Sequence, residues 1–492
     1  MSSYLEQKFN RKNNDADIKP FFAACRSLRA SIFNVINNRN TDLSIPDLDR
    51  KVCTLSFAVI ACNWLPIKSN IQDHPTFFDE LKRLFPNRTK PQLHTHRLFA
   101  KLHKFLRFLK KNRLELSVWK CIQEFRSRKF QLKEEYFGRA YEEIRKYMPK
   151  ERSFKAHFTN RKDISFVQNP SRKEHGKYYT PEDITVFITE SNIGRWINAR
   201  RSSQGSFCFR FSKDNLPLLL DPTVGAGAFL LAAVRIIEKQ WENFEDLDDE
   251  EKLTNRQTIV EHYVHGLDLD DEALMVCQFS LWLLSVGEDI SYHPNLNENF
   301  KHRDLLDELE AIHHKKRGHW SKKFDIVIGN PPYVSLSQKT QAYKKANTLN
   351  LLTTKCRNLY AYTIELSLKC LKSNGVLGLI VPLSLCIGSG FSSVRELLLT
   401  QNSWLETLNF DVVPGYLFNQ GKIEGTNKEA ITQRCTILSL DRTKDLEIIA
   451  TERIRWTDGT DRPSLFKYIK RAILETTIIP LNVWSKKKII EN

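Results

Sequence analysis

The segment with the most specific chemistry runs from Phe324 to Val334, where an apolar stretch ends in Asn330-Pro331-Pro332-Tyr333. The Asn330 side-chain oxygen and the Pro331 carbonyl can accept the two hydrogens of an amine conjugated with a ring, such as adenine N6, and favour a more tetrahedral nitrogen. The prolines restrict the backbone and so fix the second acceptor. The Tyr333 ring can stack on the base. As structure alone, two prolines can also simply terminate a strand.

A glycine loop links a buried strand ending at Leu220 to a helix, and it reads Asp221-Pro222-Thr223-Val224-Gly225-Ala226-Gly227. In doubly wound sheets the ligand crevice lies at the carboxyl ends of the strands, near such a loop. Gly225 and Gly227 permit close backbone approach. The G-x-G pattern alone fits an ordinary strand-to-helix turn or a dinucleotide loop equally well. Together with the other motifs, it predicts a cofactor site that includes Asp221 and Pro222.

A carboxylate follows the next expected strand. Asp268 can accept both hydrogen bonds of a ribose diol, and Leu269 would lie against the adenine ring of the cofactor. The alternative is that Asp268 caps the helix beginning near Glu272, although Asp270 or Asp271 suits that position better.

A third strand end is expected before Asp304, which could accept a hydrogen bond from the cofactor's adenine amine, with Leu305 beside it. A sulfonium cofactor carries an activated methyl group, so in-line transfer needs alignment rather than a metal. A base within a duplex must flip to reach the pocket, at a cost of about a few kcal/mol that stacking can offset. We therefore expect S-adenosylmethionine as cofactor, no metal, and double-stranded DNA with a flipped adenine as substrate.

These motifs require a doubly wound, Rossmann-like α/β domain preceded by a mainly α-helical domain. Residues 20–150 are poor in glycine and show helical apolar spacing, whereas short apolar runs alternate with amphipathic helices from Gly176 onward. The expected strands are 216–220, 263–267, 324–328, 375–381 and 436–440, and the expected helices are 228–240, 271–285, 359–371 and 392–400. The predicted domains are 1–150 (helical and basic), 151–175 (a linker or arm), 176–445 (catalytic) and 446–492 (a C-terminal extension).

Basic charge is concentrated in the front part of the chain. Residues 1–175 hold 36 lysines and arginines against 18 acidic residues, whereas residues 176–492 hold 39 against 40. A polyanion is the natural partner, because each neutralised phosphate releases counterions. A surface that serves only solubility, or that docks an acidic subunit, is the alternative.

Ten cysteines are scattered without a C-x-x-C pair, which favours reduced thiols over disulfides or zinc. His94, His96 and His103 lie among basic residues and fit a solvated helix face better than a metal site. No apolar run approaches the length of a membrane span, and the start lacks a signal-peptide pattern. We expect a soluble, cytoplasmic protein of bacterial type that does not contact membranes.

Taken in order, Gly176–Pro181, the glycine loop and Asn330–Tyr333 resemble the gamma class of amino-DNA methyltransferases, including the methyltransferase parts of single-chain type IIG restriction-modification enzymes. The resemblance spans roughly residues 130–445. It includes the segments Phe137–Glu142, Asn358–Tyr360 and Gly375–Pro382. It implies an adenine-specific methyltransferase of a restriction-modification or phage-defence system.

The resemblance also implies roles for residues that spacing alone does not assign. Tyr179, Thr180 and Pro181 would line the methionine end of the cofactor. Phe418 would be the second aromatic that sandwiches the flipped base, with a core phenylalanine as the alternative. Tyr333, where multisubunit systems normally have Phe, favours the type IIG group.

Members of this family usually carry a recognition domain after the catalytic domain, or rely on a specificity subunit. Here Trp456 and Arg462–Phe466 resemble the start of the segment leading into such a domain, and the chain stops at Asn492. We expect either a partner that supplies recognition or a shortened chain.

Three rival functions stay open on the sequence alone. A nuclease motif of the form P-D…E-x-K is formally matched by Pro46-Asp47 and Glu80-Leu81-Lys82, although both lie in helix-like sequence. Asn-Pro-Pro-Tyr also serves enzymes that methylate a protein glutamine or an RNA guanine amine. A non-catalytic subunit with a degenerate pocket is the weakest alternative, because every residue required for the chemistry is present.

Overall fold

The fold is taken from a computed structural model. It describes residues 15–37, 44–61, 77–79, 81–82, 95–126, 136–145, 147–151, 164–168, 180–203, 211–242, 247–286, 292, 294–296, 298–316, 318–411, 434–451, 453–454 and 466. The chain forms two compact units, one of residues 1–173 with 275–297 and the other of residues 174–274 with 298–492. None of the described helices is both long and apolar enough to cross a membrane.

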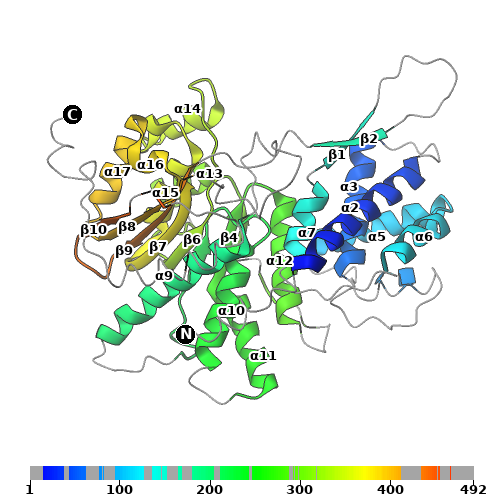
Figure 1. The fold of residues 1–492 in the computed structure, drawn as a ribbon, viewed down its shortest axis with the longest axis horizontal. Coiled ribbons are helices and arrows are strands. Elements are labelled where there is room, and N and C mark those ends of the chain that lie inside the picture. Colours follow the sequence, from blue (N-terminus) through cyan, green and yellow to red (C-terminus); the bar gives the residue numbers. More distant parts are fainter. Residues whose placement is uncertain are drawn as a thin grey trace. The chain divides into compact units, whose positions relative to one another are not determined.

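The first unit is mainly helical (Figure 1). Its elements include α2 (Asp15–Asn37), α3 (Ile45–Ala61), α5 (Thr95–Lys111), α6 (Glu115–Arg126), α7 (Tyr136–Arg145), β1 (Tyr147–Glu151) and β2 (Ile164–Gln168). Helix α2 packs against α3, α6 and α7. Arg29 on α2 is only 3% exposed and donates two hydrogen bonds of 2.7 Å from Nη2 to the two carboxylate oxygens of Asp49 on α3. This partly buried ion pair ties the two helices together, since removing Asp49 would leave the buried Arg29 charge uncompensated.

Strands β1 and β2 pair antiparallel, with Tyr147 opposite Gln168 and Glu151 opposite Ile164. The segment 151–175, expected to be a linker or arm, therefore contains the end of β1 and all of β2. Both strands are edges, which explains why they tolerate Pro149 and a polar composition that masks strand periodicity.

The second unit is built on a sheet whose strands are β3 (Leu219–Asp221), β4 (Val264–Asp268), β5 (Phe300–His302), β6 (Phe324–Gly329), β7 (Leu371–Pro382), β8 (Trp404–Asn409), β9 (Cys435–Asp441) and β10 (Ile448–Ala450). Their order is β10-β8-β9-β7-β6-β3-β4-β5. Strand β9 runs antiparallel between β7 and β8, and every other neighbouring pair is parallel. The carboxyl ends of β3, β4, β5 and β6 therefore meet at one edge.

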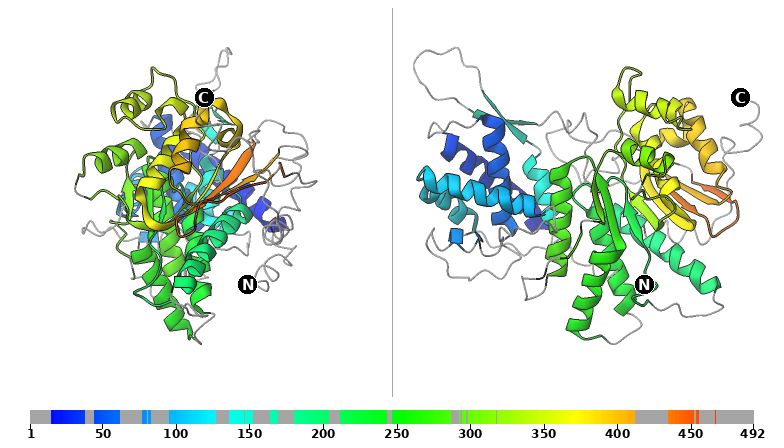
Figure 2. Two further views of the ribbon diagram at one scale, coloured as in Figure 1. Left: turned by 90° about the vertical axis from the view of Figure 1, so that its left-hand side faces the viewer. Right: turned by 180° about the vertical axis from the view of Figure 1, so that it is seen from behind.

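Helices cover both faces of this sheet (Figures 1 and 2). The helical elements of this unit are α9 (Glu182–Ser203), α10 (Ala228–Glu242), α11 (Asp249–Thr258), the π-helix η1 (Ile259–Tyr263), α13 (Leu305–His313), α14 (Gln341–Thr348), η2 (Thr354–Cys356), α15 (Leu359–Cys370), α16 (Ser384–Ile387), η3 (Ser389–Phe391) and α17 (Ser392–Leu399). Helix α12 (Asp271–Ser285) begins in this unit, and its residues from Met275 onward belong to the first unit. Helices α9 and α10 pack together on one face, and α13 and α15 pack together on the other. This doubly wound architecture confirms the predicted fold class.

Helix α9 is anchored to the sheet by packing and by charge. Gly378 on β7 lies so close to Asn192 that a Cβ there would be 2.0 Å from Asn192 Nδ2. Arg195 Nη2 lies 2.6 Å from Glu406, and Arg200 Nη2 lies 2.9 Å from Asp325. Both carboxylates are nearly inaccessible, so these ion pairs hold one register of α9 on the sheet. The residues just before α9 are held in place with it.

Candidate active site

The predicted site residues gather at the shared edge of β3, β4, β5 and β6. Those described by the structure are Thr180, Pro181, Asp221, Pro222, Gly225, Gly227, Asp268, Leu269, Asp304, Leu305, Asn330, Pro331, Pro332 and Tyr333. Tyr179 and Phe418 lie outside the described residues. Because parallel strands bring their carboxyl ends to one edge, motifs more than a hundred residues apart in sequence become neighbours here.

The glycine loop after β3 is held by the end of β4. Gly225 and Gly227 have φ values of +52° and +92°, which few residues other than glycine adopt. Val224 N donates to Leu267 O at 3.0 Å, and Gly225 N donates to Asp268 Oδ2 at 2.8 Å. Asp268 therefore shapes the loop as well as standing at the strand end.

The hydrogen bonds at the start of α12 show which of the nearby acidic residues caps the helix. Asp270 Oδ1 accepts a hydrogen bond from Glu272 N at 3.0 Å and caps the helix. Asp268 Oδ1 instead accepts from Asp270 N at 2.8 Å. Leu269 follows Asp268 and is 58% exposed, which is unusual for a leucine beside a buried strand. The helix-cap alternative thus applies to Asp270, and Asp268 faces the glycine loop.

Asp221 is buried directly beneath the Asn330 segment. Its carboxyl is 1% exposed and accepts from Thr223 N at 3.0 Å. A Cβ on Gly329 would lie 2.6 Å from Asp221 Oδ1, so only glycine fits before Asn330 without movement. Burial, opposed by the Thr223 hydrogen bond and helped by the Asp268 charge, raises the pKa of Asp221 to about 8. The neutral acid therefore predominates at neutral pH.

Asn330 presents one unused acceptor. Its Nδ2 donates to Thr180 Oγ1 at 2.9 Å, and its backbone carbonyl accepts from Thr223 Oγ1 at 3.3 Å. Its Oδ1 is buried and, within the described part of the chain, has no hydrogen-bond partner. A buried acceptor without a donor costs about 1–3 kcal/mol, and such groups concentrate where a ligand completes them.

Tyr333 is fixed against the interior. Its hydroxyl donates to Ile380 O on β7 at 3.0 Å. Its ring contacts that of Tyr360 edge-on, with 6.5 Å between the ring centroids. Burial raises the pKa of Tyr333 well above its usual range, so the phenol stays neutral. The ring is therefore held in one position rather than free to turn.

The chain beyond Tyr333 is tied to the start of α15. Leu336 N donates to Arg357 O at 2.8 Å, and Leu359 N donates to Val334 O at 3.0 Å. Asn358 Oδ1 accepts from Tyr360 N and thereby caps α15. The sequence marked Asn358–Tyr360 only as part of a family pattern. In the structure, hydrogen bonds join this segment to the loop that follows Asn330–Tyr333.

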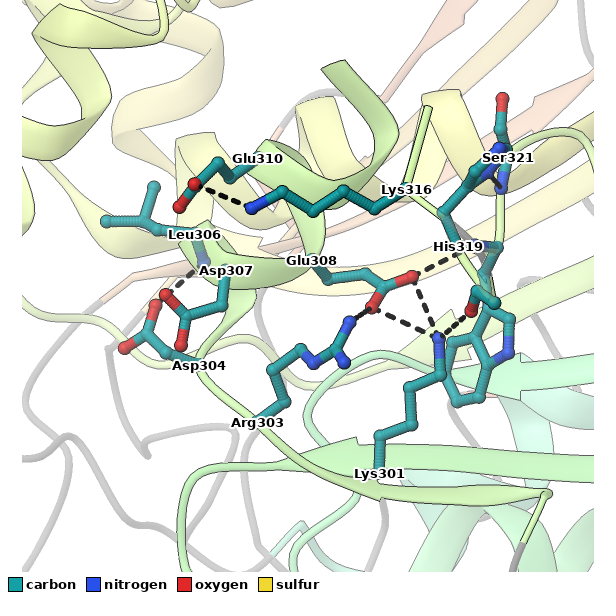
Figure 3. Close-up of polar contacts among 12 residues, drawn as sticks. Lys301, Arg303, Asp304, Leu306, Asp307, Glu308, Glu310, Lys316, His319 and Ser321 are labelled. Atoms are coloured by element: carbon teal, nitrogen blue, oxygen red, sulfur yellow. Dashed lines mark hydrogen bonds and ion pairs between the residues drawn. The ribbon is translucent and has the colours of Figure 1, made fainter. Parts of the chain in front are cut away.

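Asp304 caps α13, and Glu308 on the same helix is the centre of a partly buried ionic network (Figure 3). Asp304 Oδ1 accepts from Leu306 N at 2.7 Å, and burial raises the pKa of Asp304. Glu308 on α13 is fully buried and accepts from Lys301 Nζ at 3.0 Å and Arg303 Nη1 at 2.7 Å. The two cations come from the strand end that precedes Asp304. The network therefore ties α13, which Asp304 caps, to the end of β5. Sequence reasoning missed it because no motif marks a contact between a strand end and the following helix.

The nuclease motif is not assembled by the described residues. Asp47 lies in the first turn of α3, where its carboxylate accepts from Ser44 Oγ at 2.7 Å and contacts Arg50. Glu80 lies outside the described residues. Among the residues that the structure describes, no three His, Cys, Asp or Glu side chains gather as a metal site.

Comparison with known families identifies the region around β4 to β8. Residues 262–414 match the family described as Eco57I restriction-modification methylase. The type II restriction enzyme and methyltransferase RM.Eco57I of Escherichia coli is 26% identical over an alignment of 226 residues, which covers 38% of this chain and 22% of the relative. The modification methylase CviBIII of Paramecium bursaria Chlorella virus NC1A is 34% identical over 101 residues, or 20% of this chain and 23% of the relative. These matches confirm the resemblance to restriction-modification methyltransferases, and they span less than a quarter of each relative.

Solved structures show the same fold. The cryoEM structure of a DrdV–DNA complex matches with a TM-score of 0.54 and 12% identity, over 98% of this chain and 43% of that chain. The ATP-dependent type ISP restriction-modification enzyme LlaBIII, bound to DNA, matches with a TM-score of 0.52 and 17% identity, over 98% of this chain and 31% of that chain.

Proposed function

Because residues 262–414 match the restriction-modification methylase family, we propose that this chain transfers a methyl group from S-adenosylmethionine to adenine N6 in DNA. The observation that carries this proposal is the buried Asn330 Oδ1, which lacks a donor within the described residues and stands at the carboxyl end of β6. An exocyclic amine supplies the hydrogens that this acceptor needs. The biological setting proposed is a restriction-modification or phage-defence system, which the names of the two relatives support, one a type II restriction enzyme and methyltransferase and the other a modification methylase.

The edge of the sheet suits an adenosine cofactor. The glycine loop leaves room for close backbone approach at Gly225 and Gly227. Asp268 would accept from the ribose diol, since each carboxylate oxygen can accept more than one hydrogen bond, and Leu269 offers an exposed apolar surface to a ring. Asp304, whose Oδ1 is already used by the helix cap, would accept from the adenine amine through Oδ2. When bound, S-adenosylmethionine supplies an activated methyl group on a positive sulfur.

The chain's own residues then orient the acceptor amine. Asn330 Oδ1 would accept one amine hydrogen and the Pro331 carbonyl the other; within the described residues no donor engages that carbonyl. Tyr333, held by Ile380 O, would offer its ring to the flipped base. Tyr179 and Pro181 would lie at the methionine end, and Phe418 would contact the base from its other side. Alignment supplies most of the rate enhancement, because no strong base is needed.

The test is methyl incorporation from labelled S-adenosylmethionine into mixed-sequence duplex DNA, followed by nucleoside analysis. N6-methyladenine is the expected product. Asn330→Ala should abolish transfer and leave cofactor binding nearly unchanged, since Asn330 acts on the amine rather than on the cofactor. Surviving activity in that variant would reject the catalytic assignment.

Parallel arms with protein and RNA substrates distinguish the rival amine acceptors, and omission of magnesium removes any nuclease activity but not methyl transfer. If cofactor binds and no substrate is methylated, recognition depends on a specificity subunit or a further domain. Addition of a candidate specificity subunit that restores transfer to DNA would then support the multisubunit form of the proposal.

A further inference from the structure

Helix α5 carries a basic face with no acidic residue along it. The helix and the turn after it, residues 95–113, contain seven lysines and arginines and no aspartate or glutamate. The side chains of Lys104, Arg107, Lys110 and Lys111 are exposed, as is that of Arg113 just beyond the helix. Within the described part of the chain, none of these five makes an ion pair. What sets this face apart is that the five cations lie within residues 104–113, a stretch that contains no aspartate or glutamate.

On the side of α5 opposite these cations, the apolar side chains whose burial the structure describes are used in packing. Leu102, Phe105, Leu106 and Leu109 are all at most 3% exposed. An amphipathic helix that binds a lipid surface needs its apolar face for insertion, and here that face lies inside the protein. The only large hydrophobic side chain exposed in the described part of this unit is Leu116, whereas protein interfaces usually gather several aromatic or apolar anchors. A membrane and an acidic protein therefore both fit this surface poorly.

The spacing of the cations suits a phosphate backbone. Lys104, Arg107 and Lys111 follow one face at intervals of three and four residues, which separates them by about 4.5 and 6 Å along the axis. Duplex DNA carries about one charge per 1.7 Å of its axis, so each cation can meet its own phosphate. Lysine and arginine on a helix contact phosphates in this manner without reading sequence.

We propose that the exposed face of α5, formed by Lys104, Arg107, Lys110, Lys111 and Arg113, is a sequence-independent binding surface for the backbone of duplex DNA. This deepens the proposed function by assigning a DNA contact to the first unit, and it rests on DNA being the substrate. The face raises the affinity of the chain for duplex DNA and makes that affinity depend on salt, whereas the second unit carries the proposed site of methyl transfer.

The test measures duplex binding by fluorescence anisotropy over a range of salt concentrations, with the full chain and without methyl donor. Lys104→Gln with Lys111→Gln should lower the slope of log affinity against log salt by about 2, one for each lost phosphate contact. Affinity at low salt should fall several-fold, equally for unrelated sequences. Lys315→Gln with Lys322→Gln is the matched control, since both lysines are exposed on turns near the amino end of β6, away from the candidate site. It removes the same charge and should leave the slope as in the wild type.

An unchanged slope in the α5 variant, or an equal loss in both pairs, would overturn the proposal. Tighter binding to single-stranded RNA that is lost in the same variant would also overturn it and assign the face to RNA. Thermal melting of each variant confirms that the fold is retained. Because the assay contains no methyl donor, the two proposals fail separately: methylation of protein or RNA but not of DNA would reject the proposed function, whereas an unchanged salt slope in a chain that methylates DNA would reject only this proposal.

Discussion

Thr180 Oγ1 accepts a hydrogen bond from Asn330 Nδ2 across 2.9 Å, although the two residues lie 150 positions apart in sequence. The bond decides which way the amide of Asn330 faces. With Nδ2 engaged by Thr180, Oδ1 is the atom left as a buried acceptor. Thr180 is thus a positioning residue for the group proposed to hold the adenine amine, in addition to its expected place beside the methionine end of the cofactor.

Replacing Thr180 by Val removes the acceptor and keeps the shape of the side chain. We expect the single-turnover rate of methyl transfer to fall about tenfold or more, the equivalent of one hydrogen bond of about 1.4 kcal/mol. The affinity for DNA should change little, and the rate is measured at saturating cofactor because Thr180 is also expected beside the methionine end. Thr180→Ser retains the hydroxyl and should recover most of the rate.

An equal loss in the Ser and Val variants would show that packing rather than the hydrogen bond matters. A second readout does not depend on activity. It is the NMR signal of the Asn330 side-chain amide in protein labelled with nitrogen-15 at asparagine. It should shift in Thr180→Val, stay in place in Thr180→Ser, and be assigned by its loss in Asn330→Asp.

Gly329→Ala tests the close approach of β6 to Asp221. The added Cβ would lie 2.6 Å from Asp221 Oδ1, so the carboxyl or the Asn330 segment must move. Overpacking of this kind costs about 1–3 kcal/mol of unfolding free energy. Denaturant unfolding should show this loss, and methyl transfer should fall further than stability alone explains because Asn330 follows directly.

Gly194→Ala is the matched control for that substitution. It lies within α9, where a Cβ would meet no atom within 4 Å. Alanine is the better helix former by about 0.8–1 kcal/mol, so this variant should be slightly more stable than the wild type. A Gly329→Ala protein as stable and active as Gly194→Ala would contradict the packing that we describe.

The elements with strong periodicity were predictable, and the contacts between them were not. The apolar run of Asp271–Ser285 predicted α12 at its observed bounds. The strand expected at 216–220 is shorter and later, Leu219–Asp221, because Leu218 O accepts from Asp325 N outside the regular register. Strand β8 was missed, since Trp-Leu-Glu-Thr-Leu-Asn is neither a continuous apolar run nor a regular alternation, although all six residues are buried.

The same distinction applies to the site. Motifs at strand ends predicted which residues meet, because parallel strands share one edge. No motif predicted that Thr180 would orient Asn330, or that Glu308 would gather Lys301 and Arg303 below Asp304. Such contacts join elements remote in sequence or depend on side-chain direction, and spacing carries no information on either.

Asp221 should make stability depend on pH. Its pKa is 3.8 when exposed and is raised to about 8 by burial. Between these values the folded state keeps a proton that the unfolded chain has lost, so the free energy of unfolding falls as pH rises from about 4 to about 8. Asp221→Asn cannot ionise and should remove this dependence. The difference in Tm between Asp221→Asn and the wild type should therefore grow with pH across this window.

Asp249→Asn serves as the control for that profile. Asp249 is fully exposed on α11, so its replacement should leave the pH profile of the wild type unchanged. A constant Tm difference between Asp221→Asn and the wild type from pH 4 to pH 8 would show that the Asp221 carboxyl is ionised in the folded protein.

Asp268→Ala should weaken the binding of S-adenosylmethionine by about 10- to 100-fold, because a charged hydrogen bond contributes about 1.5–3 kcal/mol. Titration calorimetry measures this directly, with Asp249→Ala as a control that should bind like the wild type. Part of the loss comes from the glycine loop, since Gly225 N donates to Asp268 Oδ2. Asp268→Asn keeps an acceptor for Gly225 and should bind with intermediate affinity.

A thermodynamic cycle separates the two contributions of Asp268 to cofactor affinity, namely its contact with the ribose and its hydrogen bond to the glycine loop. Methylthioadenosine and its 2′-deoxy form differ only in one hydroxyl of the diol. If Asp268 binds that hydroxyl, Asp268→Ala should cost the 2′-deoxy ligand less affinity than the parent, because the deoxy ligand has already lost the contact. Equal losses for the two ligands would reject the ribose role and leave Asp268 as the residue that shapes the glycine loop.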